Sequence, residues 1–212
     1  MTNVVHLGDC MDGMCDKPDN YYDLAIVDPP YGIGAGEFGW GDKISKGWDS
    51  DRPKQEYFNE LFRMARDVFI FGANYFIDYL KPSKNIVIWD KENGKSFAND
   101  GEMIWTTKGT GFRIYREFWI SNMIRPKNMP RIHPTQKPID LYCWMLTNYA
   151  KPGDTILDTH VGSGSSRIAC HDMGFDFEGW EIDADYWRAQ EDRYKKHIQQ
   201  SELFVFEGGR IK

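Results

Sequence analysis

Residues 155–166 read Thr-Ile-Leu-Asp-Thr-His-Val-Gly-Ser-Gly-Ser-Ser, and this stretch indicates the fold class more clearly than any other. The first residues have the apolar character of a buried strand, and the glycines at 162 and 164 mark a turn. The residues from 164 to 173 then have the pattern of a helix. A strand, a glycine turn and a helix in this order form the repeating unit of α/β sheets with parallel strands.

Strands and helices alternate on both sides of this unit. Strands are expected at 4–7, 22–27, 68–71, 85–89, 102–107, 155–157 and 177–182. Helices are expected at 55–68, 75–80, 138–150, 164–173 and 184–199. The alternation predicts an α/β fold with a doubly wound, mostly parallel sheet. A length of 212 residues suits one such domain, so we expect a single domain over 1–212.

The composition is that of a globular protein, with 41% apolar and 15% aromatic residues. No stretch approaches the length of a membrane span, and the first residues lead directly into a strand, so we expect no membrane contact and a cytoplasmic location. The cysteines lack the paired spacing of a zinc site. We therefore expect reduced thiols and no metal.

The net charge of −6 is unusual for a protein that binds nucleic acid, but the charges are unevenly distributed. Between 108 and 137 there is one anion, Glu117, against seven cations: Lys108, Arg113, Arg116, Arg125, Lys127, Arg131 and Lys137. On charge alone, this segment is either a solvated loop or a surface that faces phosphates.

The glycine turn at 162–164 also has the features of a nucleoside-binding site. Glycines allow a ligand to approach the backbone, and a helix N-terminus offers free N–H groups to a carboxylate. About twenty residues later another strand ends at Glu181, whose carboxylate is placed to accept hydrogen bonds from ribose hydroxyls. These features fit any nucleoside cofactor.

A second motif, Asp28-Pro29-Pro30-Tyr31, follows the strand at 22–27. The two prolines fix φ and leave the Pro29 carbonyl free of local hydrogen bonds. A carboxylate, a carbonyl and an aromatic ring then form a rigid acceptor site for a planar base that carries an amino group. An ordinary Asp-Pro turn at a strand end is the competing interpretation of the tetrapeptide alone.

Residues 32–53 contain six glycines together with Trp40 and Trp48, and they show neither helical nor strand periodicity. We expect a flexible loop that closes over the Asp28 site, because long glycine-rich loops beside active sites often act as lids.

A third motif, His133-Pro-Thr-Gln-Lys-Pro138, lies between the other two. The three motifs in this order resemble the β-group amino-methyltransferases of bacterial and phage DNA, the N6-adenine and N4-cytosine DNA methylases. The resemblance covers roughly residues 4–197. It implies a Rossmann-like, S-adenosylmethionine-dependent methyltransferase whose sheet is circularly permuted, so that the strand ending at 7–9 follows the ribose-binding strand in space.

The resemblance also implies roles for individual residues. Asp28, Pro29, Pro30 and Tyr31 would hold the target base. The cofactor-binding residues would be Asp9, Cys10, Asp28, Thr135, Lys137, Asp158, His160, Gly162, Ser163, Gly164, Glu181 and Ile182. Within that set, Glu181 would hold the ribose, Asp9 the adenine amino group, and Thr135 and Lys137 would lie near the methionine carboxylate. DNA would be bound by Arg113, Arg116, Arg125, Lys127 and Arg131.

One position departs from the family pattern. Family members usually have Asp-Pro-Phe before the glycine turn, whereas this chain has Asp158-Thr159-His160. A titratable ring at 160 predicts that cofactor binding depends on pH between mildly acidic and neutral values.

The implied substrate is an adenine in double-stranded DNA, because Asp at the start of the tetrapeptide accompanies N6-adenine in most of the family and Ser accompanies N4-cytosine. N4-cytosine methylation, and a catalytically silent DNA-binding protein of the same fold, stay open as alternatives. Methylation of RNA or of a protein glutamine would more often show Asn at position 28. A short target-recognition insertion at about 93–131 favours a short site or a homodimer.

Overall fold

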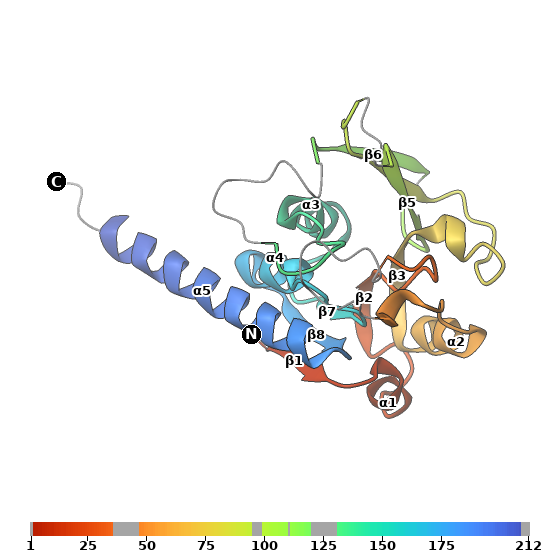
Figure 1. The fold of residues 1–212 in the computed structure, drawn as a ribbon, viewed down its shortest axis with the longest axis horizontal. Helices are drawn as coiled ribbons and strands as arrows, with labels where there is room; N and C mark the ends of the chain where they lie inside the picture. The colour runs from red at the N-terminus through yellow and green to blue at the C-terminus, as the bar shows by residue number, and fades with distance from the viewer. Residues whose placement is uncertain (1, 36–46, 95–98, 110, 120–130, 209–212) are drawn as a thin grey trace.

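The structure is a computed structural model that describes residues 2–35, 47–94, 99–109, 111–119 and 131–208, with side chains described up to residue 200. Its described residues form one eight-stranded sheet in the order β1-β8-β7-β2-β3-β5-β4-β6 (Figure 1). The strands are β1 (Asn3–Leu7), β2 (Tyr22–Val27), β3 (Ala65–Phe71), β4 (Ile86–Asp90), β5 (Gly101–Thr106), β6 (Phe112–Arg116), β7 (Thr155–Asp158) and β8 (Asp176–Glu181). All neighbouring pairs are parallel except those of β5 with β3 and β4, which confirms the mostly parallel sheet.

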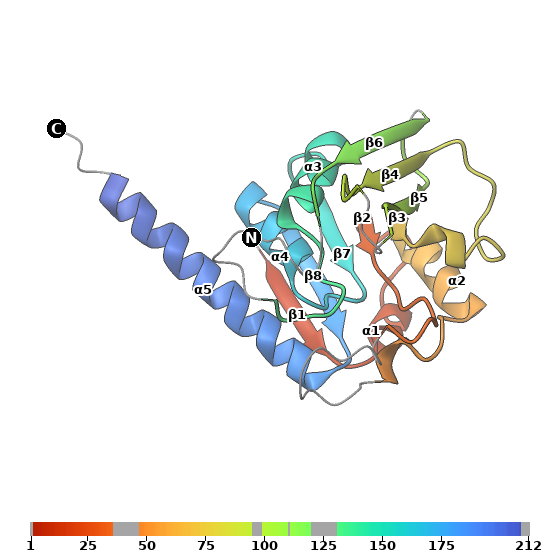
Figure 2. The same ribbon diagram turned by 45° about the horizontal axis from the view of Figure 1, so that its top comes forward.

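The sheet has the permuted connectivity expected from the sequence. The first strand, β1, pairs in parallel with β8, and Leu7 lies opposite Glu181 at the carboxyl ends of the two strands. The glycine-turn strand β7 lies on the other side of β8 and pairs with β2, the strand that precedes Asp28. The chain therefore brings its first strand and its last strand together at one edge of the sheet (Figure 2).

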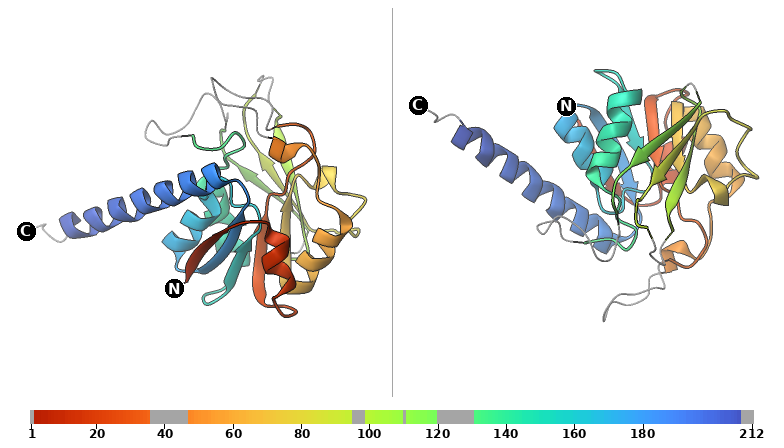
Figure 3. Two further views of the ribbon diagram at one scale, coloured as in Figure 1. Left: turned by 60° about the horizontal axis from the view of Figure 1, so that its bottom comes forward. Right: turned by 90° about the horizontal axis from the view of Figure 1, so that it is seen from above.

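Helices cover both faces of the sheet. The helices are α1 (Cys10–Cys15), α2 (Gln55–Met64), α3 (Ile139–Tyr149), α4 (Ser165–Met173) and α5 (Ala184–Gly208). α1 and α2 pack on one face, and α3, α4 and the start of α5 pack on the other (Figure 3). From there α5 extends beyond the edge of the sheet.

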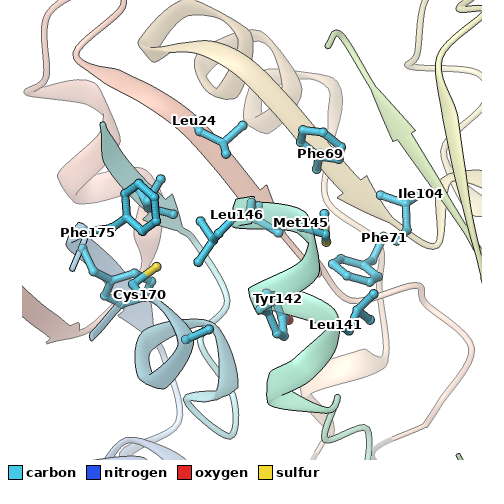
Figure 4. Close-up of a cluster of buried hydrophobic side chains, with 14 of the residues drawn as sticks. Leu24, Phe69, Phe71, Ile104, Leu141, Tyr142, Met145, Leu146, Cys170 and Phe175 are labelled. Carbon is cyan, nitrogen blue, oxygen red and sulfur yellow. The ribbon is translucent and has the colours of Figure 1, made fainter. Parts of the chain in front are cut away.

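The larger apolar core lies between the sheet and α3. Leu24 and Phe69 project from neighbouring strands toward Met145 and Leu146 of α3 (Figure 4). All four of these side chains are almost completely buried. This packing fixes α3, and with it the His133–Pro138 motif that immediately precedes the helix.

Three local predictions were wrong in the first 80 residues. Residues 10–15, where no helix or strand was predicted, form a helix, because Asp9 caps its first turn through a 2.9 Å hydrogen bond from the Met11 N–H. The helix at 55 ends at Met64, and the chain extends directly into β3. The predicted helix at 75–80 is a single 3₁₀ turn at Ala73–Tyr75.

β6 lies within the stretch 108–131, for which we expected no regular structure. Phe112 is 69% and Ile114 50% exposed on this edge strand. A strand that exposes its apolar side chains lacks the buried pattern from which strands are recognised. Within the described ranges, no helix is long and apolar enough to cross a membrane.

Candidate active site

A cavity of about 250 Å³ opens where the carboxyl ends of β1, β8, β7 and β2 meet. Parallel α/β sheets bind ligands at this edge, because loops and helix N-termini converge there. The cavity is lined by Asp9, Asp28, Pro29, Pro30, Tyr31, Ala35, Trp48, Asp49, His133, Thr135, Gln136, Lys137, Tyr142, His160, Val161, Gly162, Ser163, Glu181, Ile182 and Tyr186. The structure thus brings the three sequence motifs together around one cavity.

Asp28 stands at the end of β2 with both carboxylate oxygens engaged. The Tyr31 hydroxyl donates to Oδ1 at 2.6 Å, and the Lys137 ammonium donates to Oδ2. Burial raises the pKa of Asp28 above its ordinary value. The carboxylate is therefore a stronger proton acceptor than an exposed aspartate would be.

Lys137 is the buried member of a row of alternating charges whose other members are partly exposed. Its ammonium, in a side chain only 5% exposed, lies between Asp28 and Glu102 and is 3.4 Å from Glu102 Oε2. The Lys91 ammonium lies 2.7 Å from the other Glu102 oxygen. Burial alone would lower the pKa of Lys137, but the two carboxylates outweigh it and raise that pKa. The Lys137 ammonium thus lies on the Asp28 side of the cavity, and its predicted place near the cofactor carboxylate stays a prediction.

Tyr31 is held in place by a stacked ring and by a glycine. Its ring stacks on that of Tyr75 with centroids 4.8 Å apart and an interplanar angle of 13°. Gly72, with φ of +62°, lies so close that a Cβ there would be 2.3 Å from the Tyr31 ring. Only glycine leaves room for this ring at the end of β3.

Asp49, which was not among the predicted site residues, holds the chain that follows the tetrapeptide. One of its oxygens accepts the N–H groups of Tyr31 at 2.6 Å and Gly32 at 2.9 Å. The other accepts those of Ile33 at 3.3 Å and Ala35 at 2.7 Å. Asp49 is 2% exposed, and its contacts join both described ends of the 32–53 segment. Residues 36–46 of the predicted loop, including Trp40, lie outside the described residues.

The second half of the cavity is organised by Glu181 and the glycine turn. The Gly162 N–H donates to Glu181 Oε2 at 2.8 Å, and the Asp183 N–H donates to Oε1 at 2.9 Å. Gly162 itself has a φ of +52° and lies against the ring of His133. Each carboxylate oxygen of Glu181 keeps a further lone pair, so the side chain can still accept from hydroxyl groups of a ligand.

An aromatic wall closes the cavity on the side of the His133 motif. The His133 ring lies 5.1 Å from the Trp48 ring and 4.3 Å from the Tyr186 ring, measured between centroids. Its Nδ1 faces the hydroxyl of Thr135 at 3.1 Å. His133 and Tyr186 were missed as site residues because nothing in the local sequence shows that a loop and the start of α5 meet.

Three predicted cofactor residues do not line the cavity. Asp158 lies behind the glycine turn, where it accepts hydrogen bonds from the His160 N–H at 3.0 Å and the Ser166 hydroxyl at 2.6 Å. Burial raises the pKa of Asp158 to about 7. Gly164 begins α4 in a left-handed conformation, and Cys10 is a buried residue of the α1 core. All three lie outside the cavity lining, so their predicted contact with the cofactor stays a prediction.

The expected pH response of His160 needs correction. The ring does line the cavity, but burial lowers its pKa to about 4. His160 is therefore neutral throughout the mildly acidic to neutral range, and its titration does not make binding pH-dependent there.

The predicted DNA-binding arginines do not form one cluster in the described residues. Arg113 and Arg116 are exposed on β6, and Arg116 is 3.2 Å from Asp90. Arg131 instead donates a hydrogen bond from Nε to the His133 carbonyl at 3.1 Å, which stabilises the start of the His133–Pro138 motif. Arg125 and Lys127 lie outside the described residues.

Comparisons with known proteins agree with this arrangement. The family model described as DNA methylase matches residues 71–192. The type II methyltransferase M2.MboI of Moraxella bovis is 25% identical over 236 residues, covering 90% of this chain and 86% of its own. The M1.HpyAVI–SAM complex has the same fold, with a TM-score of 0.57 and 19% identity over 89% of this chain and 98% of that one. The cytosine-N4-specific PvuII DNA methyltransferase also shares it, with a TM-score of 0.63 and 10% identity over 92% and 86%.

Proposed function

The chain belongs to the N6/N4 DNA methylase family, and on that premise we propose that it transfers a methyl group from S-adenosylmethionine to N6 of an adenine in double-stranded DNA. The observation that carries the proposal is the largely buried Asp28 carboxylate, which lines the cavity together with Pro29 and Tyr31. This arrangement accepts hydrogen bonds from an amino group on a flat base.

The other half of the cavity fits the proposed cofactor. Glu181 has free lone pairs for ribose hydroxyls, and the glycine turn at Gly162 leaves backbone accessible beside the start of α4. Asp9, Ser163, Thr135 and Ile182 complete this half. Bound there, S-adenosylmethionine supplies an electrophilic methyl group, so the chain's own task is to position and activate the amino group. The M1.HpyAVI structure is a complex with the same molecule.

Asp28 and Pro29 would activate the target nitrogen. An aromatic amine is a weak nucleophile because its lone pair is delocalised into the ring. Two acceptors on its hydrogens favour a pyramidal nitrogen whose lone pair is directed at the methyl carbon. Transfer would form a C–N bond as the methyl–sulfur bond breaks, and the nitrogen would then lose a proton. Asp28, with its raised pKa, is placed to receive that proton.

A base inside a duplex cannot reach Asp28, so the proposal requires the target adenine to be flipped out of the helix. Flipping costs roughly a few kcal/mol of unstacking. Stacking on an aromatic ring such as Tyr31 returns roughly 1–3 kcal/mol. The proposal further treats 1–212 as a single methyltransferase domain, in which residues 93–131 form the target-recognition insertion and supply Arg113, Arg116, Arg125 and Lys127 to the DNA backbone.

The choice of adenine rests on Asp28, since the family pattern associates Asp at this position with N6-adenine. N4-cytosine is the alternative, favoured by the fold shared with the PvuII enzyme. Both bases carry an amino group beside a ring nitrogen, so either would meet the same acceptors.

Expression in a methylation-deficient bacterial host, followed by sequencing of its DNA for modified bases, tests the proposal. We expect N6-methyladenine at one short recurring sequence, and none in cells that express the Asp28→Ala variant. N4-methylcytosine at such a site would replace adenine with cytosine as the target. Unmodified DNA from cells with folded wild-type protein would contradict methyl transfer to DNA.

A further inference from the structure

His160 ends a short series of hydrogen bonds that begins at a buried tyrosine. The Tyr57 hydroxyl, on α2, lies 2.7 Å from the Thr159 hydroxyl. The Thr159 hydroxyl lies 2.9 Å from Nδ1 of His160. Tyr57 is 4% and Thr159 2% exposed, so water does not compete for these groups.

The two hydroxyl hydrogens in this series determine which group donates in each hydrogen bond. Among the described residues, the Tyr57 hydroxyl has one hydrogen-bond partner, Thr159. Its hydrogen is satisfied only if it points to Thr159 Oγ1. The Thr159 hydrogen is then satisfied only if it points to Nδ1 of His160. Any reversed arrangement leaves a buried hydroxyl hydrogen without an acceptor, which native structures avoid.

The direction of the series determines the tautomer of His160. Since Nδ1 accepts, the hydrogen of the neutral ring must be on Nε2. His160 lines the cavity, and no described group accepts a hydrogen bond from Nε2. The ring therefore presents one fixed N–H donor to whatever occupies the cavity.

We propose that His160 binds the cofactor through this Nε2–H, which donates to a nitrogen or oxygen acceptor of the bound molecule, and that Tyr57 and Thr159 act as positioning residues that hold the required tautomer. The inference rests on the proposed S-adenosylmethionine site and assigns a specific polar contact within it. It also gives a function to a ring that differs from the phenylalanine usual in the family. The low pKa of His160 agrees with a ring that stays neutral while it donates.

The first test is nuclear magnetic resonance of protein labelled with ¹⁵N-histidine at neutral pH, with the His160 signals identified by their loss in the His160→Phe variant. We expect wild-type His160 to carry its hydrogen on Nε2. Thr159→Val and Tyr57→Phe should each give a mixture of the two tautomers. The Tyr22→Phe variant is a matched control, since it removes a buried tyrosine hydroxyl that bonds Glu178 instead. A hydrogen on Nδ1 in the wild type would overturn the inference.

The second test is calorimetric titration of the same proteins with S-adenosylhomocysteine. A lost neutral hydrogen bond predicts about 5- to 10-fold weaker binding for His160→Phe. Thr159→Val and Tyr57→Phe should weaken it about 2- to 5-fold, because only part of the population then has the donor. Tyr22→Phe should bind like wild type. Equal affinity of wild type and His160→Phe would overturn this inference alone, whereas a wild-type protein that bound neither S-adenosylhomocysteine nor S-adenosylmethionine would overturn the proposed function as well.

Discussion

The Lys137 ammonium donates a hydrogen bond to the Asp28 carboxylate, 109 residues earlier in the chain. The same ammonium contacts Glu102, so one buried cation neutralises two largely buried carboxylates. A charge removed from water is tolerated only when it is paired. The pairing keeps Asp28 available at the cavity wall, and it makes the folding of the site depend on Lys137.

Replacing Lys137 by methionine should therefore destabilise the protein strongly. Asp28 would lose its cation while Glu102 kept Lys91, and breaking a buried pair typically costs about 3–5 kcal/mol. The exposed Arg188→Met change, which breaks a surface pair with Asp185, should cost less than about 1 kcal/mol. Urea unfolding of both variants measures the difference. Equal losses of unfolding free energy would show that the Lys137 pairing contributes no more to stability than the exposed pair.

Replacing Asp49 by alanine should reduce both stability and methyl transfer. The change removes the acceptor of four backbone N–H groups, and each unsatisfied buried group costs roughly 1–3 kcal/mol, less where water can enter. Asp51→Ala is the matched control, because among the described residues its side chain accepts a hydrogen bond from the exposed Ser50 hydroxyl and from no buried group. Thermal unfolding and a transfer assay with labelled cofactor check both effects. An Asp49→Ala protein with wild-type turnover would mean that Asp49 does not position the tetrapeptide.

Gly72→Ala should abolish transfer by displacing Tyr31. A Cβ at Gly72 would meet the Tyr31 ring at 2.3 Å. Gly153 is the comparison, since it also has a left-handed φ, of +91°, and no described atom within 4 Å of an added Cβ. Both alanines carry left-handed backbone strain, so their difference in turnover reports the steric effect on Tyr31. Similar turnover in the two variants would contradict the role given to Gly72.

The Asp158→Asn variant should change how stability depends on pH. The folded-state pKa of about 7 lies above the ordinary 3.8, so the folded protein holds a proton that the unfolded chain releases. The protonated Asp158 carboxyl therefore contributes to the free energy of unfolding below about pH 4, and this contribution is lost as the pH rises toward 7. Asparagine has no proton to lose; its carbonyl oxygen can accept from the His160 N–H, and its amide group can donate to the Ser166 hydroxyl.

The unfolding free energy of Asp158→Asn minus that of wild type should therefore be roughly 2–4 kcal/mol larger at pH 8 than at pH 4.5. Denaturant unfolding at the two pH values measures this. If the difference between variant and wild type were the same at both, the buried carboxyl would not titrate abnormally.

The fold and the motifs could be predicted because their signals are local. The apolar run before Asp28 and the glycine turn at 162–164 each lie within a dozen residues, and their strands form as expected. The weak strand β6 was missed because its apolar side chains stay exposed.

The rest of the site depends on contacts between distant parts of the chain. Asp49, Glu102 and Gly72 carry no local sign of their roles, which follow from where the sheet places them. Family resemblance assigned Asp158 and Cys10 to the cofactor, but neither lines the cavity, because sequence order does not show which side chain faces it.

The most direct test of the account compares wild type and Asp28→Ala in two measurements on the same preparations. One is transfer of a labelled methyl group from S-adenosylmethionine to mixed-sequence duplex DNA, and the other is calorimetric binding of S-adenosylhomocysteine. Lys137 retains Glu102 as a partner in the variant, so the fold should survive. We predict that Asp28→Ala loses transfer by at least about a thousandfold while its affinity for S-adenosylhomocysteine changes less than about threefold. Undiminished transfer, or a collapse of cofactor binding with transfer, would contradict the assignment of Asp28 to the target base.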